Sequence, residues 1–217
     1  SRGYVYGQQK MIAQFNCTGD WAFYIEGDEI YHEKELSQIK KSMEMYLNDS
    51  DVEALVFDFN HFYGNANSVL NSPGWYRSEA RIIKNSVRSY APDGLFWLVL
   101  DSNKKGRYPK AKHTGVTCYH YGWVRSQEQM SLKSSKVQKY WGGEPVKVDY
   151  TQMDQTIIQE FQGTHPEIMK DWLPKDTGLY KVDSAYKPTR KQIKHRLMIK
   201  LENFFGIEMS KKHYKLV

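Results

Sequence analysis

Two helical and two extended patterns alternate between residues 7 and 59 of this 217-residue chain. Residues 7–17 and 33–47 repeat apolar side chains at helical spacing, whereas the apolar runs at 21–25 and 52–59 are short and predict strands. A chain that alternates helix, strand, helix and strand is typical of a parallel sheet covered by helices. The pattern therefore predicts an α/β fold with a mixed, mainly parallel sheet flanked by helices.

The rest of the chain is predicted to add strands first and helices later. Asn-, Gly- and Lys-rich segments at 60–75 and 101–115 have the composition of loops. Strands are predicted at 79–84, 95–100 and 116–119, and helices at 126–140, 151–162, 166–173 and 188–205. The change from strands to helices predicts a boundary near residue 150, with a main domain at 1–150 and a helical extension at 151–217.

The positive charge of the chain belongs to its C-terminal part. The net charge is +6, and residues 181–217 hold ten Lys or Arg against three acids, so the first 180 residues are close to neutral. This basic segment is either a solvated helix face or a surface that contacts anionic lipid at a membrane. Since no helix-turn-helix, zinc-finger or RNA-recognition signature accompanies it, we expect no nucleic-acid partner.

The remaining composition predicts a cytoplasmic protein that is either soluble or peripheral to a membrane. Two cysteines allow at most one disulfide, which favours a reducing compartment. The longest apolar run, 95–100, is too short to span a bilayer, and no secretory signal opens the chain.

Three carboxylates follow the first predicted strand, in the sequence GDWAFYIEGDEIYHE at 19–33. Glu26, Asp28 and Glu29 are so close together that they require a cation, hydrogen-bond donors or open water. The carboxyl edge of a parallel sheet is where ligands collect, and a hard divalent cation there is usually shared with substrate phosphates. Gly27 would let a diphosphate approach the backbone. The alternative is a solvated acidic turn.

Three segments resemble motifs of the family-two glycosyltransferases. The first is the acidic segment at 19–33, which resembles the region of the Asp-x-Asp motif. The second and third are WYRSEARIIKN at 75–85 and CYHYGWVRS at 118–126. They occur in the family's order within residues 7–130, and the resemblance fades after about residue 150.

The resemblance implies a GT-A fold, a nucleotide-diphosphate sugar donor, a manganese or magnesium cofactor and inversion at the anomeric carbon. Carried over by position, Asp28 would bind the metal. Glu26 stands where the first Asp of the motif usually lies, near the nucleotide ribose or the metal. The family's nucleotide-binding opening would precede residue 7, so the resemblance implies that the chain is the acceptor-side portion of an enzyme or builds its base site otherwise.

Two further side chains are assigned to the donor site. The imidazole of His120 would complete the metal sphere begun by Asp28. Its alternative is a hydrogen-bonded residue of the core. Arg81 would bind donor phosphate oxygens, as Arg77 and Arg125 also could, although surface arginines commonly bind none.

The acceptor and the catalytic base complete the predicted site. His61, Tyr63, Trp75 and Arg77 would line the sugar or acceptor pocket, unless 60–75 is simply a loop stabilised by local turns. An inverting transfer needs a carboxylate that removes a proton from the attacking hydroxyl. Glu79 and Asp93 are the two candidates; Glu79 could instead pair with an arginine, and Asp93 could be a turn residue.

These residues predict a metal-dependent glycosyltransferase. It would move a sugar from a nucleotide-sugar to a hydroxyl of a glycan, a lipid-linked or a small-molecule acceptor. The alternative is a non-catalytic basic module that binds a membrane surface, a glycan or phosphate. A nucleotidyltransferase is a third possibility, but it usually needs a Gly-rich phosphate loop near its start, and none is visible.

Overall fold

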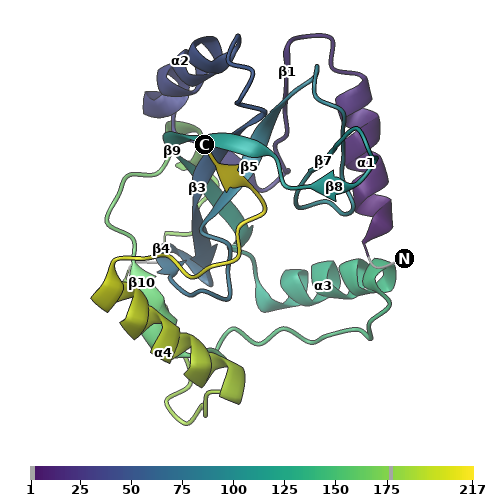
Figure 1. Cartoon of the computed structure of the whole chain (residues 1–217). Helices are drawn as coiled ribbons and strands as arrows, with labels where there is room; N and C mark the ends of the chain where they lie inside the picture. The colour runs from purple at the N-terminus through teal and green to yellow at the C-terminus, as the bar shows by residue number, and fades with distance from the viewer. Residues whose placement is uncertain (1–2, 176–177) are drawn as a thin grey trace.

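The chain was examined as a computed structural model that describes residues 3–175 and 178–217. Within these residues, eight strands form one sheet and three short strands form a second (Figure 1). The helices are α1 Tyr4–Phe15, α2 Leu36–Tyr46, α3 Gln127–Trp141 and α4 Arg190–Phe205, with single 3₁₀ turns η1 Glu33–Glu35, η2 Gln155–Ile157 and η3 Glu167–Met169. The α/β class predicted from the sequence is confirmed.

The large sheet is mixed. Its strands are β1 Trp21–Phe23, β2 Glu29–Tyr31, β3 Ala54–Tyr63, β4 Asn65–Leu70, β5 Ser78–Lys84, β9 Lys110–Trp123, β10 Ile158–Glu160 and β11 Lys215–Leu216. The small sheet contains β6 Ser89–Tyr90, β7 Leu98–Leu100 and β8 Gly106–Arg107. In the described residues, β9 runs parallel to β3 and to β11, while the other pairs of the large sheet are antiparallel.

The prediction that the sheet is mainly parallel was wrong. Strands β1 and β3 do run in the same direction, as expected for strands joined through α2, but β5 lies between them and is antiparallel to both. The short connection from β3 to β4 joins strands of opposite direction, and β4 and β5 run in the same direction on either side of β3. Gly64, with a φ of 73°, makes the turn between β3 and β4.

Two local predictions were also wrong. Residues 60–75 were expected to form a loop, but they contain the end of β3 and all of β4. Residues 151–162 were expected to form a helix. Instead Asp154 caps a single turn by accepting a hydrogen bond from the Thr156 amide, and the chain then pairs with β4 as strand β10. Sheet pairing determined the structure of both segments.

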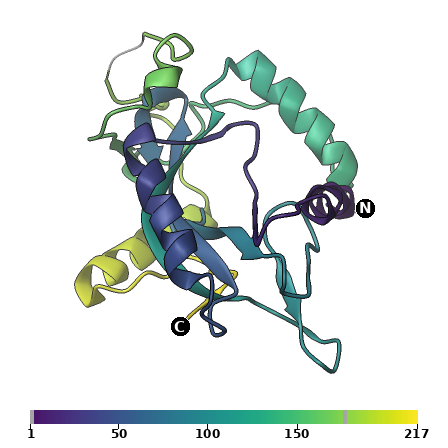
Figure 2. The same cartoon turned by 90° about the horizontal axis from the view of Figure 1, so that it is seen from above.

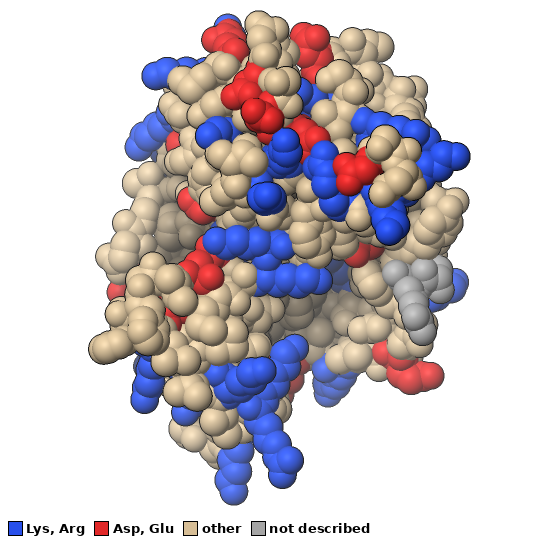
Figure 3. All heavy atoms as spheres, in the orientation of Figure 1, with Lys and Arg blue, Asp and Glu red and all other residues tan. Residues whose placement is uncertain are grey.

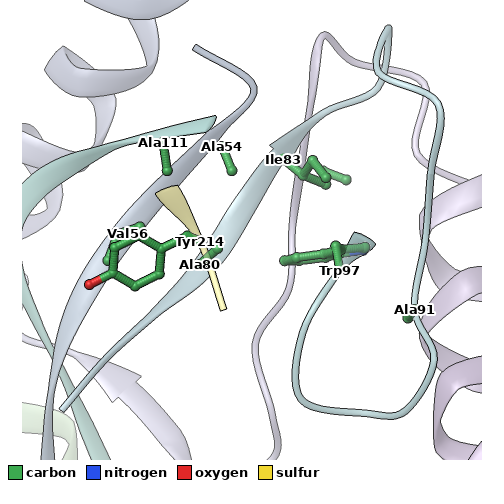
Figure 4. Close-up of a cluster of buried hydrophobic side chains, with 9 residues drawn as sticks. Ala54, Val56, Ala80, Ile83, Ala91, Trp97, Ala111 and Tyr214 are labelled. Carbon is green, nitrogen blue, oxygen red and sulfur yellow. The ribbon is translucent and has the colours of Figure 1, made fainter. Parts of the chain in front are cut away.

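Both faces of β3 are buried, so the sheet lies between two apolar layers. Leu55, Phe57 and Phe59 pack with Ile39 of α2 on one face. The opposite face has small side chains from three strands, Ala54, Ala80 and Ala111. Figure 4 shows them around the ring of Tyr214, with Trp97 beside Ile83 on the other side of the cluster. The alanines leave the space that the C-terminal tyrosine fills.

The C-terminal segment adds edge strands and one helix to this sheet. Strand β10 pairs with β4, and β11 pairs with β9. Thr189 begins α4 with a capping box, and Gly206, at a φ of 65°, ends it. The proposed division near residue 150 stays a prediction. No helix in the described parts of the chain is long and apolar enough to cross a membrane.

The packing against α2 predicts a large cost for truncating Phe57, which is fully buried. Phe57→Ala should lower the free energy of unfolding by about 3–5 kcal/mol, because it removes apolar contacts and leaves a cavity. Phe15→Ala, at an exposed position of α1, is the control and should change stability by less than about 0.5 kcal/mol. Urea denaturation followed by circular dichroism measures both; equal losses would contradict the packing described.

Candidate functional site

A cavity of about 680 Å³ opens beside the acidic turn between β1 and β2. The turn contributes Glu26, Gly27 and Asp28 to its wall. Aromatic and charged side chains from α1, α3 and several loops line much of the rest, among them Tyr6, Tyr24, Tyr76, Asp93, Arg125, Lys133 and Trp141. Figure 2 shows α3 and α1 meeting near the N-terminus, where the Gly3 amide donates to the Tyr140 carbonyl oxygen.

A second cavity, of about 690 Å³, lies against the same turn. It shares Gly27, Asp28 and Arg125 with the first cavity. Its wall includes apolar side chains at and after η3: Ile168, Met169, Trp172 and Leu173. The acidic turn therefore stands between two hollows of small-molecule size.

The carboxylate of Glu29 is neutralised by a buried arginine. Glu29 and Arg81 are both buried, and Nε and Nη2 of Arg81 donate to the two oxygens of Glu29 over 2.5–3.1 Å. Burial would lower the pKa of Arg81, but the charge of Glu29 and these hydrogen bonds raise it, so the guanidinium stays charged. Arg81 thus holds the turn in place and does not face the cavity, contrary to the prediction that it binds phosphate.

Asp28 is held by a lysine of α3. Lys133 Nζ lies 2.6 Å from Oδ2 of Asp28, and Arg125 lines the same region of the cavity. Burial would raise the pKa of Asp28, but the hydrogen bond from Lys133 and the nearby positive charges lower it. The carboxylate is therefore ionised at neutral pH. Arg81 and Lys133 offset the negative charges of Glu29 and Asp28, which lie close together.

Glu26 is the most accessible carboxylate of the turn. Its side chain is 37% exposed and lies 3.6 Å from Nη2 of Arg81. Burial raises the pKa of Glu26, Arg81 partly offsets this, and the charges of Glu29 and Asp28 add to the rise. Glu26 therefore accepts a proton more readily than an isolated glutamate and faces the first cavity.

A pair of histidines lies beneath Asp28. Parallel pairing of β3 with β9 places His61 beside His120, and antiparallel pairing of β2 with β9 places Glu29 on the other side of His120. Nδ1 of His61 lies 2.9 Å from Nδ1 of His120, and Nε2 of His61 lies 2.7 Å from the carbonyl oxygen of Tyr76. Four groups therefore lie in a row: the carbonyl oxygen of Tyr76, the imidazoles of His61 and His120, and the carboxylate of Asp28.

These contacts determine which nitrogens hold protons. The carbonyl oxygen of Tyr76 only accepts, so His61 donates to it through Nε2. Burial lowers the pKa of His61 to about 3, so the ring is neutral and its Nδ1 accepts from Nδ1 of His120. Burial also lowers the pKa of His120, which favours the neutral ring. The Nε2 lone pair of His120 then faces Oδ1 of Asp28, 3.7 Å away.

Two acceptors that face each other in this way suit a cation. A separation of 3.7 Å is less than twice a metal–ligand bond of about 2.1 Å, so one ion could contact both atoms. An imidazole beside a carboxylate favours Mn²⁺ over Mg²⁺. Among the described residues, no group of three or more His, Cys, Asp or Glu could hold a metal. Such an ion would depend on substrate oxygens and water for its other ligands.

Gly122 is required by the close approach of the two metal-site candidates. A Cβ added at Gly122 would lie 2.5 Å from Nε2 of His120 and 3.0 Å from Oδ2 of Asp28. By contrast, a Cβ at Gly27 would meet nothing within 4 Å. Gly122 therefore leaves room for His120 and Asp28, while the space over Gly27 is open, as expected for a backbone that a ligand approaches.

Asp93 lies in the first cavity on a loop held by two buried cations. Nζ of Lys10 donates to the carbonyl oxygens of Gly94 and Leu95 at 3.3 and 3.1 Å, and Nη1 of Arg81 donates to that of Leu95 at 3.2 Å. The Leu95 amide donates to Oδ1 of Asp93, which is the turn contact that the sequence also allowed. Asp93 is thus positioned beside the acidic turn.

Glu79 does not reach the cavity, and its predicted role as a base is corrected. Its side chain is fully buried, Oε1 accepts from the Ala80 amide, and Oε2 lies 2.6 Å from Nδ1 of His213. The ring of Phe96 stacks on His213 and closes that side. A substrate hydroxyl has no access to Glu79, so it is a structural residue that holds the C-terminal segment.

The four predicted acceptor-site residues are not brought to either cavity. His61 and Tyr63 are buried, with His61 bonded through both nitrogens and the Tyr63 hydroxyl donating to the Tyr150 carbonyl oxygen. Trp75 packs against the apolar cluster that contains Tyr63, Leu70 and Met130, and Arg77 forms an ion pair with buried Glu202 at 2.9 Å. The prediction failed because 60–63 continue a central strand, whose side chains face packed layers.

Sequence reasoning missed Lys133 and Lys10. Lys133 lies on a helix that was predicted correctly, yet it is more than a hundred residues from its partner Asp28, and no local pattern signals that pairing. Lys10 is buried over the ring of Trp97, 3.6 Å from its centroid. A lysine in a helix sequence usually indicates a solvated face, so neither residue carried a signal.

No family model matches the sequence, and no curated protein matches it. The function is therefore inferred from the geometry of the site and from the sequence motifs.

The crowding at Gly122 predicts that even a methyl group there disturbs the site. Gly122→Ala should displace His120 or Asp28 and lower the melting temperature by several degrees, since overpacking costs about 1–3 kcal/mol. Gly19→Ala is the control, because its added Cβ has no neighbour closer than 4.0 Å. Thermal denaturation and the imidazole signals in NMR spectra measure the change; unchanged His120 signals in Gly122→Ala would contradict the geometry.

The buried neutral state of His61 predicts a pH dependence of stability. Its folded pKa, about 3, lies below the unfolded value near 6.5, so the unfolded state binds more protons between these values and stability falls as pH falls through this window. The loss should approach about 1.4 kcal/mol per pH unit from this one group. His61→Gln should remove that part of the slope between pH 6 and 5 in urea denaturation.

His113 supplies a control of opposite sign. The hydrogen bond from His113 to Asp58 raises the pKa of His113, so the stability it contributes is present below pH 6.5 and is lost as pH rises through its folded pKa. His113→Gln should therefore steepen the loss of stability on acidification from pH 7.5 to 6.5. The same change of slope in both variants would contradict the assignment of His61.

Proposed function

We propose that the chain is a metal-dependent, inverting glycosyltransferase. One observation carries the proposal: Asp28 Oδ1 and the Nε2 lone pair of His120 face each other at the edge of a cavity that also contains Lys133 and Arg125. The motifs that resemble family-two glycosyltransferases supply both residues. A GT-A fold is part of this proposal.

The residues of the first cavity suit a nucleoside diphosphate as leaving group. Lys133 and Arg125 would face phosphate oxygens, and the open space over Gly27 would admit the diphosphate to the backbone. His61 fixes the tautomer of His120, and Arg81 fixes the turn. A Mn²⁺ or Mg²⁺ ion held by Asp28 and His120 would supply neutralisation of the charge that grows on the leaving diphosphate.

Asp93 is the base in this proposal, since Glu79 is buried. Its loop is held beside the acidic turn by Lys10 and Arg81. The carboxylate would take the proton of the acceptor hydroxyl as that oxygen attacks the anomeric carbon. Trp141 lines the same cavity as Asp93, and its indole face suits the apolar face of an acceptor sugar ring.

A phosphate-binding module without catalysis is the second candidate. It is favoured by the pairing of Asp28 with Lys133, which balances the carboxylate without any metal. In that case Arg125 and Lys133 would bind an anion directly, and Mn²⁺ would not strengthen its binding. The two functions therefore differ in their dependence on metal.

Metal-dependent binding of a diphosphate tests the proposal. Inorganic pyrophosphate, UDP, GDP and dTDP are each titrated with and without Mn²⁺, and the melting temperature is recorded. With Mn²⁺, at least one should stabilise the wild type, by about 3 kcal/mol when present at about a hundred times its Kd. Asp28→Asn should lose this Mn²⁺-dependent gain, because an amide is a poor ligand for a hard cation.

Asp20→Asn, which removes an exposed acid near the same strand, should retain the full gain. Stabilisation that is equal with and without Mn²⁺, and equal in Asp28→Asn, would reject the metal role and favour the binding module. The role of Asp93 as the base is tested by measuring release of the diphosphate from UDP-, GDP- and dTDP-sugars. Asp93→Asn should lose this release and retain Mn²⁺ binding. No stabilisation by any of the four anions would reject both functions.

A further inference from the structure

Helix α4 presents its apolar face to solvent. Ile193, Leu197, Leu201, Phe204 and Phe205 form the α4 patch, and their exposed fractions range from 37% to 81%. Exposed apolar patches of this kind on soluble domains mark interaction sites more often than chance. The patch therefore requires a covering partner.

The opposite face of α4 packs on the protein through polar contacts. Glu202 is buried and accepts from Arg77 at 2.9 Å, and Arg196 donates to both oxygens of Asp154 at 2.6 and 2.7 Å. The side chain of Ile199 also faces inward, and it packs against the apolar cluster around Tyr63. The orientation of α4 is thus fixed by ion pairs, and its apolar face is turned outward by them.

Cations flank the α4 patch, and acids do not. Arg190, Lys191, Lys194 and Lys200 are exposed on α4, whereas its one acid, Glu202, faces inward. Figure 3 shows Lys and Arg side chains projecting at the lower end of the molecule, where α4 lies in Figure 1. On the outer face of α4, Arg190 and Lys194 are interspersed with the apolar side chains, and Lys191 and Lys200 lie beside them.

We propose that α4 lies in the surface of an anionic membrane, with the α4 patch among the acyl chains and the lysines at the lipid headgroups. An exposed amphipathic helix with Phe and Leu on one face and Lys and Arg beside them is suited to such an interface. A second copy fits less well, because a two-fold contact would bring the same lysines face to face. Nucleic acid would leave the apolar centre without apolar contacts.

The membrane contact leaves the candidate site accessible. Figures 1 and 2 show α4 and α3 in separate parts of the molecule, and α3 is the helix that borders the first cavity. The inference does not depend on the proposed function, since it stands on the α4 patch alone. It adds that the protein works beside a lipid surface.

Vesicle co-sedimentation tests the proposal with the full chain. The protein should bind vesicles of phosphatidylcholine with phosphatidylserine, bind phosphatidylcholine alone much more weakly, and lose affinity as salt is raised. Phe204→Ser and Phe205→Ser should each weaken binding roughly tenfold, because each removes one buried aromatic anchor. The triple change Lys191→Glu, Lys194→Glu and Lys200→Glu should abolish the preference for anionic vesicles.

Matched controls separate the α4 patch from general charge and hydrophobicity. Phe15→Ser changes an exposed Phe of α1, and the triple change Lys34→Glu, Lys40→Glu and Lys41→Glu alters net charge equally on exposed positions. Both should bind like the wild type. Phe204→Trp should bind normally, and its emission should shift to shorter wavelength on anionic vesicles.

Three results would overturn the proposal. The first is a wild type that ignores anionic vesicles. The second is an equal loss of binding in the control triple variant. The third is a dimer, detected by light scattering, that Phe204→Ser dissociates while vesicle binding is unchanged.

Discussion

The buried guanidinium of Arg81 is the interaction on which the candidate site depends. It binds the carboxylate of Glu29 with Nε and Nη2, and the carbonyl oxygen of Leu95 with Nη1. One side chain of β5 thereby joins the acidic turn to the loop of Asp93. A buried charge that loses its partner costs about 3–5 kcal/mol, so replacing either Arg81 or Glu29 alone would strongly destabilise this part of the structure. The positions of Asp28 and Asp93 both follow from this pair.

Local periodicity predicted most of the helices and strands, but it could not predict their neighbours. The segments that became α1, α2, α3, α4, β1, β3 and β5 were located within a few residues. The insertion of β5 between β1 and β3 is a pairing between distant segments, and nothing in a local window contains it. The expectation of a mainly parallel sheet failed for that reason.

The site was predictable where its residues adjoin a strand and unpredictable where they come from elsewhere. Asp28 and His120 were both chosen from motifs, and the register of β2 with β9 places them 3.7 Å apart. Arg81 and His61 were chosen as ligand contacts but are buried supports, because side-chain direction depends on register shifts between β3 and its neighbours β5 and β9 that a sequence does not reveal. Lys133 pairs with Asp28 from a helix far along the chain.

Helix α3 buries only Met130 among its 15 described residues, and yet it borders the first cavity. Near its C-terminal end the Tyr140 carbonyl oxygen accepts from the Gly3 amide before α1, and Lys133 of the same helix donates to Asp28. A cation that displaced Lys133 from Asp28 would therefore also loosen α3, which forms this wall of the first cavity. The affinity for such a cation is therefore linked to how firmly α3 is held in place. A change that fixed α3 more firmly would weaken binding of the cation, even if every atom that contacts the cation stayed the same.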